Sequence, residues 1–168
     1  GTGLLNRGAV DVYIRFIEEN FGSAAELLDR HSITTGWGSA YLPVAAWAYR
    51  ETGREEAAQM LIDASAREVA TYGDDVSGNW VYSRSIARHA AVTGDDEGAL
   101  DALRRCVDNG MRLLLEIDAP YYGHLREDER FKAIRADLLQ KVNAERAEAG
   151  LPPYRPVSAT EERPTFVN

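Results

Sequence analysis

The sequence predicts an all-α protein in which helical hairpins stack on one another and a C-terminal helix caps the stack. Three observations predict this fold class. Two segments 41 residues apart share one pattern of small, turn-forming and acidic residues. Both segments are rich in alanine, which favours helices and lets them approach closely. Near the C-terminus, apolar residues recur at helical spacing.

Composition limits the classes of function. The chain has 168 residues, of which 45% are hydrophobic and 27% are charged, so a folded domain or a short repeat array is expected. The net charge of −8 argues against binding to nucleic acid or to an anionic membrane surface, because both need clustered cations. No apolar run approaches the roughly 18 residues of a membrane span.

The shared pattern lies in residues 45–58 and 86–99. Each segment carries a Thr-Gly pair, then two acidic residues, then a small residue and alanine. Glycine tolerates the left-handed conformation that ends a helix, so Gly53 and Gly94 are expected to close one helix each. The acidic residues that follow suit the positive N-terminus of the next helix. Each segment is therefore expected to form a helical hairpin.

This spacing resembles the tetratricopeptide repeat, which has a small residue, an aromatic residue, a turn glycine, an alanine and a large apolar residue at fixed offsets. In this chain the pattern falls on two clear units and on one more degenerate unit in which Asn20 replaces the turn glycine. The three sets are Ala46, Tyr49, Gly53, Ala58 and Ile62; Ala87, Ala90, Gly94, Ala99 and Leu103; and Val12, Tyr13, Phe16, Asn20 and Ala25.

The resemblance covers roughly residues 7–110 and departs from the family in two ways. Ala90 stands where the family prefers an aromatic residue. The period is 41 residues rather than about 34, and we expect the surplus in a turn-rich linker at 71–79. A generic helical bundle remains the alternative fold, since alanine-rich helices can imitate the pattern.

The C-terminal third is expected to cap the array. Pro120 interrupts any long helix, so residues 115–122 are predicted to be a short connection. Residues 128–148 are predicted to form one helix with its apolar face on Phe131, Ile134, Leu138 and Val142. We expect residues 1–150 to be the helical repeat domain and 151–168 an extended or disordered tail, because the tail is rich in proline and charge.

Residues 125–131 resemble the closing segment of tetratricopeptide regions in bacterial multidomain regulators. The resemblance implies that this chain is the C-terminal interaction region of such a protein, in the cytoplasm or the periplasm. The opening Gly1-Thr2-Gly3 lacks a methionine and suggests a fragment of a larger protein. No effector domain is recognised, so no catalytic activity follows from the resemblance.

No catalytic or metal-binding constellation emerges from the sequence. His31, His89 and His124 are not spaced as metal ligands, and we expect them to have ordinary packing or surface roles. Cys106 is the only cysteine and is expected to be buried and inert. We therefore expect no cofactor, no metal and no enzymatic activity. An all-α enzyme using these histidines is the least favoured alternative.

A peptide-binding groove is the functional hypothesis. In stacked hairpins the first helices line the concave side, and the family register places Trp47, Arg50, Arg84 and Arg88 there. Arginine holds carboxylates bidentately and tryptophan offers apolar area, so the expected ligand is an acidic peptide or a chain-terminal carboxylate.

Two alternatives to this groove stay open. Trp47 could simply pack in the core while the arginines pair with Glu51 and neighbouring acids. The module could also self-associate as a homodimer.

Overall fold

The computed structural model describes residues 15, 19–31, 41–72 and 78–154. Every regular element in these ranges is helical, which confirms the predicted all-α class. The elements in chain order are α2 (Phe21–His31), α3 (Leu42–Glu51), α4 (Glu55–Val69), α5 (Trp80–Thr93), α6 (Asp96–Asp108), α7 (Leu114–Ile117), the 3₁₀ helix η2 (Pro120–Leu125) and α8 (Glu129–Glu148).

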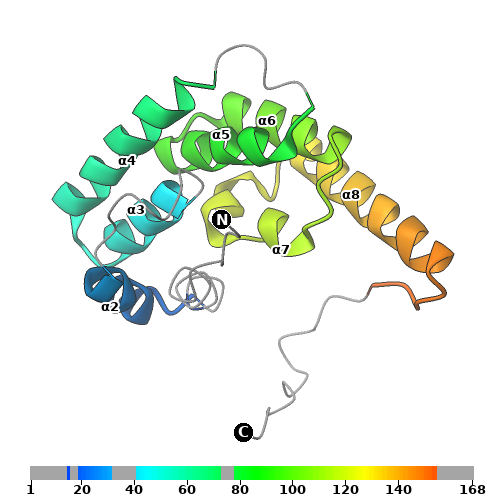
Figure 1. Ribbon diagram of the computed structural model, residues 1–168, viewed down its shortest axis with the longest axis horizontal. Coiled ribbons are helices and arrows are strands. Elements are labelled where there is room, and N and C mark those ends of the chain that lie inside the picture. The colour runs from blue at the N-terminus through cyan, green and yellow to red at the C-terminus, as the bar shows by residue number, and fades with distance from the viewer. Residues whose placement is uncertain (1–14, 16–18, 32–40, 73–77, 155–168) are drawn as a thin grey trace, which may run out of the picture.

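The helices follow an arc (Figure 1), with α4 along its outer edge and α3 and α7 on its inner side. The most extensive contacts are within two antiparallel hairpins, α3 with α4 and α5 with α6. The hairpins meet because α5 touches both α3 and α4. Helix α2 packs on α3 at one end, and α8 packs on α6 and α7 at the other.

The two predicted turns have the same backbone geometry. Gly53 and Gly94 adopt left-handed φ values of 74° and 80°, directly after α3 and α5, as the sequence predicts. The amide after each glycine donates to a carbonyl five residues earlier, a pattern that satisfies the open end of a helix. These two hydrogen bonds are Arg54 N to Tyr49 O at 2.8 Å and Asp95 N to Ala90 O at 2.9 Å.

The threonines before these glycines also match. Thr52 Oγ1 donates to the carbonyl oxygens of Ala48 and Tyr49, both at 3.0 Å. Thr93 Oγ1 donates to the equivalent carbonyls of His89 and Ala90, at 2.9 and 3.1 Å. The Thr-Gly pair therefore ends both first helices in one way. The similarity of the two segments extends from sequence to hydrogen bonding.

Small residues let the helices of each hairpin approach closely. The alanines that the sequence pattern singles out are at most 1% exposed: Ala46, Ala58, Ala87 and Ala99. Tyr49 fills space beside the first turn and donates its hydroxyl to Asp29 of α2 at 2.9 Å. Larger buried side chains, among them Ile62, Leu100 and Leu103, fill the rest of the hairpin cores.

The degenerate first unit differs from its prediction. Glu19, not Asn20, adopts the left-handed conformation, with φ of 56°. Asn20 instead directly precedes α2, and its side chain accepts a hydrogen bond from Ser23 N at 3.2 Å. Asparagine is a favoured N-cap because its short side chain reaches the free amides of a first turn. The assignment of Asn20 as the turn residue was therefore wrong by one position, and Val12, Tyr13 and Phe16 lie outside the described residues.

The C-terminal third forms two short helical turns and one long helix. The predicted connection at 115–122 contains α7 and the start of η2, because proline is well tolerated in a first helical turn. The predicted long helix is α8, with Asp128 as its N-cap. Phe131, Ile134 and Leu138 are buried, as predicted, and Val142 is partly buried.

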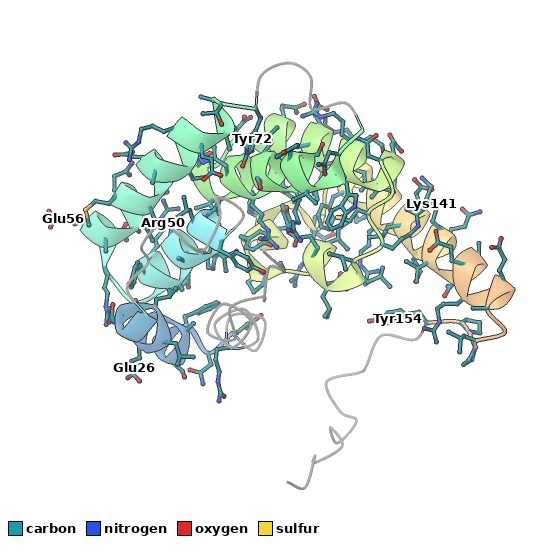
Figure 2. The ribbon with its side chains drawn as sticks, viewed as in Figure 1. Glu26, Arg50, Glu56, Tyr72, Lys141 and Tyr154 are labelled. Atoms are coloured by element: carbon teal, nitrogen blue, oxygen red, sulfur yellow. The ribbon has the colours of Figure 1, made fainter. Side chains whose placement is uncertain are left out.

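The segment after α8 turns back on the helix. Tyr154 lies beside the C-terminal end of α8 (Figure 2), and its amide donates to Asn143 Oδ1 at 2.7 Å. Residues 151–154 are thus non-helical but anchored, and the rest of the predicted tail, 155–168, lies outside the described residues. Among the described helices, none has the length and hydrophobicity of a bilayer span.

Candidate peptide-binding surface

The structure separates the four predicted groove residues into three places. Trp47 and Arg50 line a hollow between α3, α5 and η2. Arg84 is partly buried in the first turns of α5. Arg88 lies in the core. The repeat register predicted one groove for all four residues, but only Trp47 and Arg50 line the same hollow.

Arg88 is a correction to the sequence-based expectation. Its side chain is 2% exposed and pairs with the 1% exposed Glu116 of α7, so it is not available to a ligand. Arg88 Nε donates to Glu116 Oε1 at 2.8 Å, and the Nη2 group binds Glu116 Oε2. The acid that neutralises Arg88 comes from the C-terminal third, 28 residues away. The alternative expected the arginines to pair with Glu51 and neighbouring acids; Arg88 does pair with an acid, but that acid is the distant Glu116.

The Arg88–Glu116 pair is completed by tyrosines. Tyr121 donates its hydroxyl to Glu116 Oε1 at 2.6 Å. The rings of Tyr41 and Tyr121 lie 5.8 and 6.0 Å from the guanidinium carbon. Burial alone would raise the pKa of Glu116, but the charge and hydrogen bonds of Arg88 and the Tyr121 hydroxyl lower that pKa below its ordinary value. The carboxylate therefore stays ionised inside the core.

The hollow at Trp47 and Arg50 has a volume of about 270 Å³. Its other walls are the end of α5, residues 91–94, and His124 of η2. Arg50 lies on α3 (Figure 2), and its Nη1 group donates to Val92 O at 2.9 Å. This bond caps the carbonyl end of α5 with a cation and fixes the guanidinium at the edge of the hollow.

Trp47 and Arg50 keep donor capacity for a ligand. Trp47 is partly buried and its Nε1 atom is fully buried without a hydrogen-bond partner. Arg50 meets only one carboxylate in the described part of the chain, Glu55 at 3.9 Å, which is 72% exposed. Such a long, solvated ion pair contributes little and is readily replaced.

Arg84 forms no ion pair in the described part of the chain, although its charge helps to lower the pKa of the buried Glu116, which is itself paired with Arg88. The Nε atom of Arg84 is buried and has no hydrogen-bond partner. Its guanidinium carbon lies 5.1 Å from the ring centre of Trp80. Buried donors are satisfied in most folded proteins, so an orphan of this kind indicates a missing partner.

Two residues that shape this surface, Glu116 and His124, were not predicted from the sequence. Glu116 went unnoticed because a single acid in a predicted connection carries no signal of burial. His124 lines the hollow, and its Nε2 atom lies 3.0 Å from Asp96 Oδ1. Only the packing of η2 on α5 brings it there. No periodicity in the sequence could have placed it.

The other candidates for chemistry named from the sequence, His89 and Cys106, make contacts within the fold. His89 Nδ1 lies 3.1 Å from Ser65 Oγ, and burial lowers the pKa of the imidazole against the opposing charge of Asp95. Cys106 is fully buried, as predicted, and burial followed by the charge of Glu116 raises the pKa of its thiol to about 12. The side chain of His31 lies outside the described residues. Across the described ranges, no group of three His, Cys, Asp or Glu residues is arranged to hold a metal.

Comparisons with protein-family models, with curated proteins and with solved structures found no significant match to this chain.

Proposed function

We propose that the chain is a non-catalytic interaction module of the tetratricopeptide type, which binds an acidic peptide along the inner side of its arc. The equivalent turns at Gly53 and Gly94 support a repeat. So does the packing order, in which α5 contacts both helices of the preceding hairpin. The resemblance of residues 125–131 supports a place within a bacterial regulatory protein.

The observation that carries the proposal is the cation of Arg84, which forms no ion pair in the described part of the chain. The carboxylate whose pKa its charge helps to lower, Glu116, is buried and paired with Arg88, so a partly buried guanidinium in a chain of net charge −8 is suited to an acid from outside. The stack on Trp80 holds the guanidinium in one orientation, so less entropy is lost when a carboxylate binds. Val81, one turn earlier and 37% exposed, adds apolar area on the same face.

The hollow at Trp47 is proposed as the second contact for the same peptide. It combines an unsatisfied indole donor with the cation of Arg50. An acceptor on the peptide, such as a carboxylate or a backbone carbonyl, would satisfy Trp47 Nε1 once a shift of the indole ring exposes this buried atom. Both contacts involve the first helices of the hairpins, which line the inner side in this type of array.

A displayed library of random peptides tests the proposal, with the full chain as bait. We expect selected peptides to be rich in Asp and Glu. The Arg84→Gln variant is expected to bind the consensus peptide about tenfold or more weakly, as measured by titration calorimetry, because a charge-assisted hydrogen bond is lost. Trp47→Phe, which keeps an aromatic ring but removes the fused pyrrole ring with its N–H, is expected to weaken binding to a smaller extent.

Arg67→Gln is the matched control, since Arg67 is an exposed arginine on α4. It is expected to bind like the unmodified chain. Selected peptides without acidic enrichment, or equal affinities for Arg84→Gln and Arg67→Gln, would contradict the proposal.

Self-association is the second candidate, supported by large apolar side chains at the surface. Met60 is 63% exposed and Leu115 is 60% exposed. Light scattering separates the two functions. A monomer at all concentrations that still binds acidic peptide supports the peptide-binding function. A stable dimer in which Arg84 is covered, so that no peptide binds, supports self-association.

A further inference from the structure

A second hollow, which shares no lining residue with the proposed peptide surface, lies where α8 begins. Its volume is about 370 Å³, within the range of small-molecule sites. It is lined by the residue after α7, the residue after η2 and the first two turns of α8: Asp118, Arg126, Phe131, Lys132 and Arg135. Three of these five side chains are cations, although the whole chain has a net charge of −8.

Asp118 organises both arginines of this hollow. Arg135 donates Nε to Asp118 Oδ1 at 2.7 Å and Nη2 to Oδ2 at 3.1 Å, so its fork is occupied. Arg126 Nη2 donates to the backbone carbonyl of the same residue at 3.1 Å. Arg126 is thereby tethered through one N–H. Elsewhere in the described part of the chain, no carboxylate forms an ion pair with it.

Lys132 adds a second cation that a ligand can recruit. Its Nζ atom lies 3.3 Å from Glu127 and 3.0 Å from Glu129. These carboxylates are 94% and 87% exposed, and ion pairs in such high dielectric contribute little. An anion entering the hollow can therefore compete for Lys132 at small cost.

The exposed lining of the hollow is mostly apolar, with the buried Phe131 beneath it. Phe131 is 2% exposed, and its ring centre lies 6.2 Å from that of Tyr122. The aliphatic stems of the lysine and arginines extend the apolar wall. The hollow thus presents one apolar surface and a partly unsatisfied cationic rim.

We propose that this hollow binds a small organic anion, whose carboxylate or phosphate group is held by Arg126 and Lys132 and whose apolar body lies against the aliphatic stems that cover Phe131. The guanidinium of Arg126 matches either group, because both present paired oxygens. The proposal does not depend on peptide binding at Arg84.

Titration calorimetry of the full chain with benzoate, phenyl phosphate and inorganic phosphate tests the proposal. We expect saturable binding of benzoate or phenyl phosphate, and the tighter of the two identifies the preferred headgroup. Inorganic phosphate is expected to bind more weakly, because it lacks the apolar body. Benzyl alcohol, which has the ring without the charge, is expected not to bind.

Two variants with opposite expected effects separate a direct role from a structural one. Arg126→Gln is expected to weaken binding about tenfold or more, the loss typical of one charge-assisted hydrogen bond. Asp118→Asn removes the competing carboxylate and frees the fork of Arg135, so it is expected to strengthen binding. Thermal unfolding of each variant reports whether it is folded.

Arg146→Gln is the matched control, because Arg146 also donates to a backbone carbonyl, that of Pro152 at 2.7 Å. It is expected to leave the titration unchanged, as is Arg84→Gln. The absence of saturable binding at millimolar concentrations of all three anions would overturn the proposal. Equal affinity of the folded Arg126→Gln variant would do the same.

Discussion

At the scale of single residues, the arginines of this chain differ by what surrounds each guanidinium. Arg88 is neutralised in the core by Glu116, Arg50 caps a helix end, and Arg84 lies over the face of Trp80 without an ion pair in the described part of the chain. The sequence pattern placed all three arginines on the same concave face. Helical spacing indicates which face a residue occupies but not which acid lies next to it. The distinction arises from α7, which the sequence shows only as a connection.

The Arg88–Glu116 pair yields a stability prediction. Glu116→Gln leaves a buried cation without its counter-charge and is expected to lower the free energy of unfolding by about 3–5 kcal/mol. Urea denaturation measures the loss. The double variant Arg88→Met with Glu116→Gln should lose less than the sum of the single variants, because it removes both charges. Additive losses would contradict a direct interaction between the two side chains.

His89 yields a prediction about pH. Burial lowers its pKa below the ordinary 6.5, so the folded state favours the neutral imidazole. Its contribution to stability is complete above pH 6.5 and is lost as pH falls toward the lowered pKa, because the unfolded chain binds the proton first. Unfolding free energies measured from about pH 7 to about pH 5 should therefore fall less steeply in His89→Gln than in the unmodified chain.

At the scale of elements, the two hairpins are set by their turns. Gly53 and Gly94 adopt left-handed backbone, both threonine hydroxyls bond back to the preceding turn, and Asp95 caps α6 through Gly98 N at 3.0 Å. These features were predictable, because each depends on residues close in sequence. The misplacement of the turn at Glu19 and Asn20 has the same origin, since two adjacent polar residues compete for the turn and cap positions.

The turn glycines yield the prediction for this scale. Gly94→Ala places a side chain on a left-handed residue and is expected to cost about 1–2 kcal/mol of unfolding free energy. A Cβ at Gly94 would meet nothing within 4 Å, so the cost is one of backbone conformation alone. Gly22→Ala is the control, because Gly22 lies in α2 with equally open surroundings. Denaturant titration should show no loss for Gly22→Ala, and an equal loss in both variants would contradict the explanation.

At the scale of the whole molecule, the central hairpin is covered on both sides. Helix α5 contacts α3, α4, α6 and η2, and α8 covers α6. Among the described helices, the main neighbours of α4 are α3 and α5, and α4 lies along the outer edge of the arc (Figure 1). Met60 on α4 is 63% exposed. Local stability in such a stack follows the number of covered faces.

Native-state hydrogen exchange tests this ordering. We expect the amides of α5 and α6 to exchange slowest, near the global unfolding free energy, and those of α4 to exchange through partial opening of the first hairpin. Exchange in α4 as slow as in α5 would show instead that the molecule opens only as a unit.

The sequence by itself determined the all-α class, the closing of α3 and α5 at glycine, the long helix α8 and the buried thiol of Cys106, because local propensity and periodicity decide these features. Only the tertiary structure decided which arginines form ion pairs with acids and which do not. Glu116, Asp118 and His124 approach the arginines through the packing of α7, η2 and α8, and contacts between residues distant in sequence leave no periodic signal.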